Sequence, residues 1–195
     1  MARRLIGTGT TDSNGRITVS YTGTGAGKLQ LVAVNGNLLS ETYVLTDCLF
    51  YQAGTSEPPT NTWVLGGFTP SYDANGTTLT STTFATCFAN KPGTGANAYD
   101  WTGPFAVEFD ITNVSSSDAD IQLYDETYNA TRSFNVLGIT GACHVKIENT
   151  GTSINYYIND VEKTAQQYNY SMGTCRVGLR GTGTITFKNF MIYQI

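Results

Sequence analysis

Alternation of apolar and polar residues with a period of two recurs along this chain, and it limits the fold more than any other feature. The clearest case is PFAVEFDIT (104–112), whose apolar residues fall on one face of a strand. These residues are Phe105, Val107, Phe109 and Ile111. Such runs are separated by turn residues, and no window shows a long helical period. The pattern predicts an all-β sandwich or barrel without helices.

Composition agrees with strands and excludes several function classes. Of the 195 residues 40% are hydrophobic, which suffices for a sandwich core, and 13% are charged. The net charge is −4 and the charges are scattered, so the basic surface that nucleic acid requires is missing. The N-terminal MARRLIGTGTTD lacks the apolar core of a signal peptide, and no stretch is long enough to span a membrane. We expect no nucleic-acid partner, no membrane insertion and no signal for secretion.

The glycines of YTGTGAGKLQ (21–30) at first suggest a phosphate-binding loop. That loop requires G-x-x-x-x-G-K-[ST], but Thr22 replaces the first glycine and Leu29 the final hydroxyl residue. The segment also leads into a strand pattern rather than a helix. We interpret it as a glycine-rich turn between strands and expect no nucleotide cofactor.

The cysteines do not form a metal motif. Cys48, Cys87, Cys143 and Cys175 show no C-x-x-C spacing, and the chain has a single histidine. We expect no metal, no other cofactor, and free, mostly buried thiols in a reducing compartment. Outside a cell, three disulfide pairings remain open.

Two units follow from the spacing of the strand patterns. RITVSY (16–21), KLQLVAV (28–34) and LLSETYVL (38–45) predict a small antiparallel unit with too few strands for a complete immunoglobulin-like sandwich. Later strands are longer and richer in aromatic residues, which places a boundary near residue 47 and gives units 1–46 and 47–195. Near the C-terminus, a β-bulge at 188–189 would bring Phe187 and Phe190 onto one face.

Both units resemble known families. TTDSNGRITVSYTGTGAGKLQLVAVNGNLLSETYVLTDC (10–48) resembles the last part of the bacterial Ig-like repeats in adhesin-like surface proteins, especially those of methanogenic archaea. The remainder, with AVEFDI, VKIENTGTSINYYIND and RVGLRGTGTITFKNFMIY, resembles the concanavalin A-like superfamily of lectins, laminin G-like domains and glucanases. The resemblance implies a jelly-roll antiparallel β-sandwich preceded by a partial Ig-like β unit.

The same resemblance raises the question of catalysis. Glucanases of this superfamily carry E-x-D-x-E on one strand, with a nucleophilic and an acid/base glutamate. Glu108 and Asp110 take the first two positions, but Thr112 takes the third and Asn113 follows it. His144 lies on the polar face of its strand without a serine or cysteine nucleophile motif nearby. We therefore expect no catalytic residue and interpret Glu108 and Asp110 as solvent-facing strand residues.

Binding is the better function class. Sugar sites combine aromatic faces with carboxylates and amides. NAYDWTG (97–103) and LYDETYNATR (123–132) offer this mixture, and Trp101 alternatively plugs the edge of the core. The candidate ligand-binding residues are Tyr99, Asp100, Trp101, Tyr124, Asp125, Tyr128 and Asn129.

The expected cellular setting combines two observations: the sequence resembles surface adhesins, and its N-terminal residues do not read as a secretion signal. We expect a virion surface protein, a fibre tip or capsid decoration, that binds a host surface glycan or glycoprotein. A partial N-terminal sheet must cover its apolar face and edges, which favours contact with other virion subunits in a homo-oligomer such as a trimer. The alternatives are a fragment of a secreted cell-surface adhesin, and a divergent glucanase-like carbohydrate-binding module.

Overall fold

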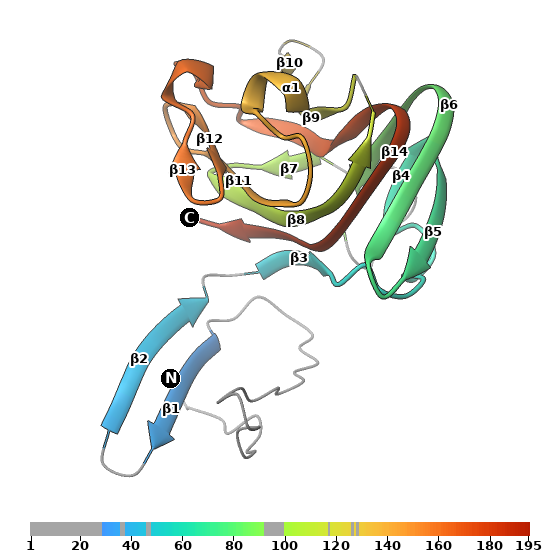
Figure 1. Ribbon diagram of the computed structural model, residues 1–195. Helices are drawn as coiled ribbons and strands as arrows, with labels where there is room; N and C mark the ends of the chain where they lie inside the picture. The colour runs from blue at the N-terminus through green and yellow to red at the C-terminus, as the bar shows by residue number, and fades with distance from the viewer. Residues whose placement is uncertain are drawn as a thin grey trace.

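The computed structural model describes residues 29–35, 38–45, 48–91, 100–116, 118–125, 127 and 129–195, with side chains from residue 49 onward. Nearly all regular structure in these residues is β-strand (Figure 1). The strands are β1 (Leu29–Asn35), β2 (Leu38–Leu45), β3 (Cys48–Gln52), β4 (Trp63–Gly66), β5 (Thr69–Asp73), β6 (Gly76–Ala89), β7 (Asp100–Thr102), β8 (Phe105–Ser115), β9 (Asp120–Tyr124), β10 (Asn129–Ser133), β11 (Cys143–Asn149), β12 (Ile154–Ile158), β13 (Val161–Glu162) and β14 (Thr174–Gln194). Two short helical turns, α1 (Phe134–Leu137) and η1 (Thr164–Gln166), accompany them.

The long strands β6 and β14 pair with each other and pass from one layer of the sandwich to the other (Figure 1). The first half of β14 pairs with β7, β9 and β6, and its second half pairs with β6, β8 and β3. We call the strands β10, β9, β7, β4 and the first half of β14 the β9 layer. The β8 layer holds β13, β12, β11, β8, the second half of β14, and β3 and β5. The fold is a jelly-roll antiparallel β-sandwich, as the sequence predicted.

The core lies between these layers. The four apolar residues predicted to share a face of β8 are at most 1% exposed, which confirms that prediction. In the same layer, Tyr156 of β12 donates a hydrogen bond of 3.3 Å to the Ala130 carbonyl of β10, which joins the β8 layer to the β9 layer. Burial of these side chains is the main stabilising contribution to the fold.

The predicted β-bulge in β14 is present. Its register against β8 shifts between Lys188 and Met191, and Asn189 has a positive φ of 53°. The shift turns both Phe187 and Phe190 into the core, where each is at most 1% exposed.

Gly181 and Gly183 mark the point where β14 changes layers. Their φ angles are 143° and 80°, in the region that favours glycine, and the pairing with β6 shifts between them. Asp118 braces this segment, because its Oδ1 accepts hydrogen bonds from the amide of Thr182 at 2.8 Å and the hydroxyl at 2.7 Å. These bonds, together with that from Ser116, hold the pKa of the Asp118 carboxyl below its ordinary value.

The prediction that the chain has no helix was wrong. α1 begins after Ser133, whose hydroxyl accepts a hydrogen bond from the amide of Val136. It ends at Leu137 and is followed by Gly138, which has a φ of 77°. A serine N-cap and a glycine after the last helical residue thus suffice for one turn in FNVL, which is too short to show a helical period. No helix in the described residues has the length and apolar character needed to cross a membrane.

The N-terminal strands β1 and β2 pair with each other in a sheet separate from the larger one. The predicted strand at 16–21 and most of the glycine-rich turn lie outside the described residues. β3, which begins at Cys48, pairs with β14 in the larger sheet. The domain boundary near residue 47 and the Ig-like character of the first unit stay predictions.

Candidate functional site

The fold brings the two predicted binding segments to one surface. Asp100 begins β7, Tyr124 ends β9 and Asn129 begins β10. Asp125 follows Tyr124, and its carboxylate accepts the amide of Thr127 at 2.6 Å. Of the three remaining candidates, Tyr99 and Tyr128 lie outside the described residues, and Trp101 lies in β7 beside Asp100.

Arg176 of β14 lies between these segments and completes a cross-strand row. The register pairs Asp100 with Arg176, Arg176 with Tyr124, and Tyr124 with Asn129, so the four residues lie side by side on neighbouring strands. The Arg176 Nε lies 3.3 Å from Asp100 Oδ1, and the guanidinium carbon lies 5.6 Å from the centre of the Tyr124 ring. The sequence analysis missed Arg176, although its alternation with buried Cys175 and Val177 is a signal that it faces outward.

Parallel rows extend this surface on the same side of the β9 layer. Gln122 is paired with Gly178, which is paired with Phe88 of β6. Gln122 is only 5% exposed, and it supports Asn129 by donating a hydrogen bond of 3.2 Å to its Oδ1. Beyond them, Arg180 forms an ion pair of 2.8 Å with Asp120 and lies over the exposed ring of Phe84. We call these rows the β9-layer face: Asp100, Arg176, Tyr124, Asn129, Gln122, Phe88, Arg180, Asp120 and Phe84.

Trp101 does not belong to this face, so its inclusion among the surface ligand-binding residues is corrected. Its side chain is 3% exposed, and its indole N–H donates a hydrogen bond of 3.1 Å to the Ala89 carbonyl. In β7 the residues on either side, Asp100 and Thr102, face outward, so the pleat turns Trp101 inward. The alternative interpretation, that Trp101 plugs the core, describes its position.

Glu108 and Asp110 lie on the outer side of the β8 layer, away from the β9-layer face. Asp110 accepts hydrogen bonds from His144 Nδ1 at 2.9 Å and Asn189 Nδ2 at 2.7 Å, and Glu108 accepts the hydroxyl of Tyr193. Lys146 bridges two acids, with its Nζ 2.8 Å from Glu148 and 3.9 Å from Glu108. At the third position of the glucanase pattern, the Thr112 hydroxyl donates a hydrogen bond of 2.9 Å to the Asn75 carbonyl.

The surroundings of these groups shift their ionisation. Burial alone would raise the pKa of the Asp110 carboxyl, but the hydrogen bonds from His144 and Asn189 outweigh it and the net shift is downward. Burial, followed by the hydrogen bond to Glu108, raises the pKa of the Tyr193 hydroxyl. Asp110 is therefore held as a carboxylate, and Tyr193 as a protonated donor.

The cysteines in the described part of the chain are free thiols. Cys87 and Cys175 are buried and Cys143 is half-buried, while the Cys48 side chain lies outside that part. Burial raises the pKa of the Cys87 and Cys175 thiols, which keeps them protonated. Among the residues with described side chains, no group of three His, Cys, Asp or Glu residues could hold a metal ion.

No family model and no curated protein matches this chain by sequence. Among solved structures, the chain is similar to the carbohydrate binding module CBM66 from Bacillus subtilis, with a TM-score of 0.51 and 15% identity over 70% of this chain and 98% of that one. It is also similar to a protein of unknown function with a galectin-like fold from Bacillus subtilis, with a TM-score of 0.54 and 11% identity over 75% and 96% of the two chains. A predicted glycosyl hydrolase from Parabacteroides distasonis gives a TM-score of 0.50 and 9% identity over 75% and 100%. At these identities the likeness shows the fold alone, a jelly-roll β-sandwich.

Proposed function

We propose that the jelly roll is a non-catalytic carbohydrate-binding domain and that the β9-layer face holds the glycan. The observation that carries the proposal is the row of Asp100, Arg176, Tyr124 and Asn129, which unites both predicted binding segments on neighbouring strands. The fold adds support, because one similar structure is a carbohydrate-binding module.

The chemistry of this row suits a sugar ring. The apolar side of a pyranose packs on an aromatic face such as that of Tyr124, while hydroxyl groups pair with carboxylate, guanidinium and amide groups. The Asp100 carboxylate and the Tyr124 ring both contact Arg176, so the guanidinium is positioned before a ligand arrives. Such preorganisation lowers the entropic cost of binding.

Tyr124→Ala tests the position of the site. We expect this change to weaken glycan binding at least about tenfold, because it removes the stacking surface and one contact of Arg176. A glycan array identifies the ligand, and calorimetry on the same ligand gives the affinities. Tyr51→Ala is the matched control, since Tyr51 is 58% exposed but belongs to β3 of the β8 layer. Loss of affinity in Tyr51→Ala with unchanged binding in Tyr124→Ala would move the site to the β8 layer.

The non-catalytic part of the proposal rests on Thr112. A retaining mechanism needs a second carboxylate about 5–5.5 Å from the first, and the Thr112 hydroxyl at the expected position is bonded to a backbone carbonyl. We expect no release of reducing ends from β-glucans during prolonged incubation with the protein. Turnover that disappears in Glu108→Gln would contradict this expectation and identify the β8 layer as an active site.

The biological setting remains a proposal from the sequence. In one setting the domain is a fibre tip or capsid decoration on a virion surface, and in the other it belongs to a secreted cell-surface adhesin. Glycan binding serves attachment in both settings. Imaging of virions with antibodies against the chain tests the first setting, and light scattering of the purified protein at micromolar concentration tests the expected homo-oligomer.

A further inference from the structure

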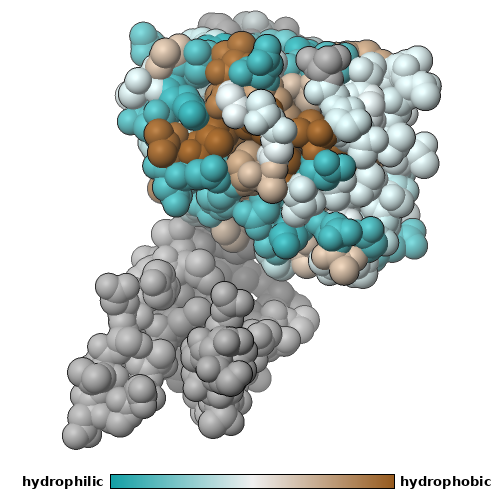
Figure 2. All heavy atoms as spheres, viewed as in Figure 1, coloured by the Kyte–Doolittle hydropathy of each residue, from teal (hydrophilic) through white to brown (hydrophobic). Residues whose placement is uncertain are grey.

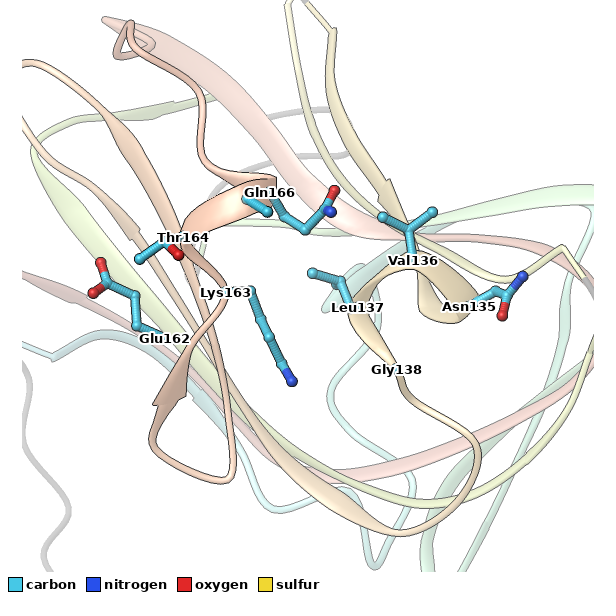
Figure 3. A pocket seen from close by; sticks show the side chains of 9 residues that line it. Asn135, Val136, Leu137, Gly138, Glu162, Lys163, Thr164 and Gln166 are labelled. Carbon is cyan, nitrogen blue, oxygen red and sulfur yellow. The ribbon is translucent and has the colours of Figure 1, made fainter.

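A shallow pocket that is widely open to solvent lies between α1 and the β13–η1 turn, apart from the rows of the β9-layer face (Figure 3). Its volume is about 320 Å³, at the lower end of the range typical of small-molecule sites. One wall is formed by residues 135–138 and the other by residues 162–166. Figure 2 shows apolar residues gathered on this side of the jelly roll, around α1.

Both walls are fixed to β10, so the pocket is formed without a ligand. α1 follows β10 directly, and its last turn is closed by a hydrogen bond of 3.0 Å from the Gly138 amide to the Asn135 carbonyl. Arg132 of β10 holds the other wall, because its Nε donates a hydrogen bond of 2.8 Å to the Gln166 carbonyl. The Arg132 guanidinium lies 3.7 Å from the centre of the Tyr168 ring, which restricts its movement.

The charge inside the pocket is positive. Lys163 is half-buried and forms no ion pair within the described residues, and Figure 3 shows its ammonium group extending into the space between the walls. Glu162 is the acid in the lining, but its carboxylate is directed away from this space and accepts a hydrogen bond of 2.6 Å from Gln167. The pocket thus presents a cation without an acidic neighbour facing it, in a chain whose net charge is −4.

The remaining lining combines apolar and amide groups. Leu137 is 1% exposed and lies at the base, while Val136 is 52% exposed at the rim. The side-chain amide of Gln166 is directed toward α1 and can exchange hydrogen bonds with hydroxyl groups, whereas the Asn135 amide is directed away from Lys163 (Figure 3). A ligand that fits has one negative charge, several hydroxyl groups and an apolar side, which is the chemistry of a carboxylated sugar ring.

We propose that this pocket binds a uronic-acid residue of an acidic glycan, with its carboxylate on Lys163. The inference rests on the proposed function, because it assigns an acidic substrate class to the glycan and adds a second contact to the one on the β9-layer face. The carboxylate forms a charge-assisted hydrogen bond with the ammonium group, and the ring packs against Val136. Association then weakens as salt is raised.

The test uses the full chain and oligosaccharides of galacturonic, glucuronic and mannuronic acid, each beside its carboxyl-reduced neutral counterpart. We expect at least one acidic oligosaccharide to bind about tenfold more tightly than its neutral counterpart, as for one charge-assisted hydrogen bond. Lys163→Gln should abolish this difference and leave the affinity for the neutral form unchanged. Lys188→Gln removes the same charge from the β8 layer and is the matched control.

Each contrary result has a distinct meaning. Equal affinity for acidic and neutral oligosaccharides, with Tyr124→Ala still weakening both, would overturn the pocket assignment and leave the proposed function standing. Equal effects of Lys163→Gln and Lys188→Gln would show attraction by overall charge and overturn it as well. Lys163-dependent binding of oligoglutamate, without binding of any glycan, would instead assign the pocket to an acidic protein segment and contradict both proposals.

Discussion

Replacing Gly183 by alanine is expected to destabilise the jelly roll by at least about 3 kcal/mol, the sum of left-handed backbone strain and steric overlap. Gly183 has a φ of 80°, and a Cβ there would lie 2.3 Å from the Ser115 carbonyl oxygen. That oxygen belongs to the backbone of β8, so it cannot rotate away as a side chain could. For a chain of this size, each 1 kcal/mol corresponds to a decrease in Tm of roughly 2–4 °C, and thermal unfolding measures the loss.

Gly138→Ala is the matched control. Gly138 has nearly the same φ, 77°, but a Cβ there would meet no atom within 4 Å. Its replacement should cost only the backbone strain, about 1–2 kcal/mol. The difference between the two variants isolates the contact with β8 at the layer crossing. Equal losses of stability would show that β14 crosses between the layers without this close approach.

Local patterns explain which parts of the fold were predictable. The apolar face of β8 and the bulge near Asn189 follow from the spacing of neighbouring residues, and both are present. The turn in α1 was missed because four residues are too few to show a period. Trp101 faces the core because it is the inward residue of the three-residue strand β7. The sequence around it does not reveal which of these three residues face inward, so the choice between core and ligand stayed open.

The candidate sites depend on pairing between distant segments. Arg176 meets Asp100 and Tyr124 only because β14 inserts between β7 and β9, across 76 residues of sequence in the case of Asp100. The composition of each segment indicated sugar chemistry, yet nothing local specified that the two segments share a face. The pocket at Lys163 is formed similarly by turns from separate parts of the chain.

Trp101→Ala is expected to destabilise the protein by about 3–5 kcal/mol, the range for truncating a buried large aromatic residue. The centre of the Trp101 ring lies 5.9 Å from the centre of the Phe50 ring. The Phe50 ring centre lies 5.4 Å from that of Trp63 and 6.0 Å from that of Phe190. The change therefore opens a cavity beside an aromatic cluster that joins β3, β4, β7 and β14. It also leaves the Ala89 carbonyl without the indole N–H, a loss of about 1–3 kcal/mol when the site stays dry.

Two measurements separate this structural role from ligand contact. Trp101→Phe keeps most of the ring volume and removes the hydrogen bond to Ala89, so urea unfolding should place its stability between those of the wild type and Trp101→Ala. Under conditions where each variant is folded, both should bind the glycan with wild-type affinity, because the 3% exposed side chain offers no surface to a ligand. Weaker binding by Trp101→Ala at unchanged stability would contradict the core position. Loss of stability in Trp101→Ala together with loss of affinity in Tyr124→Ala would show that the two aromatic residues have separate roles. Trp101 then supports β7 from the core side, and Tyr124 contacts the sugar.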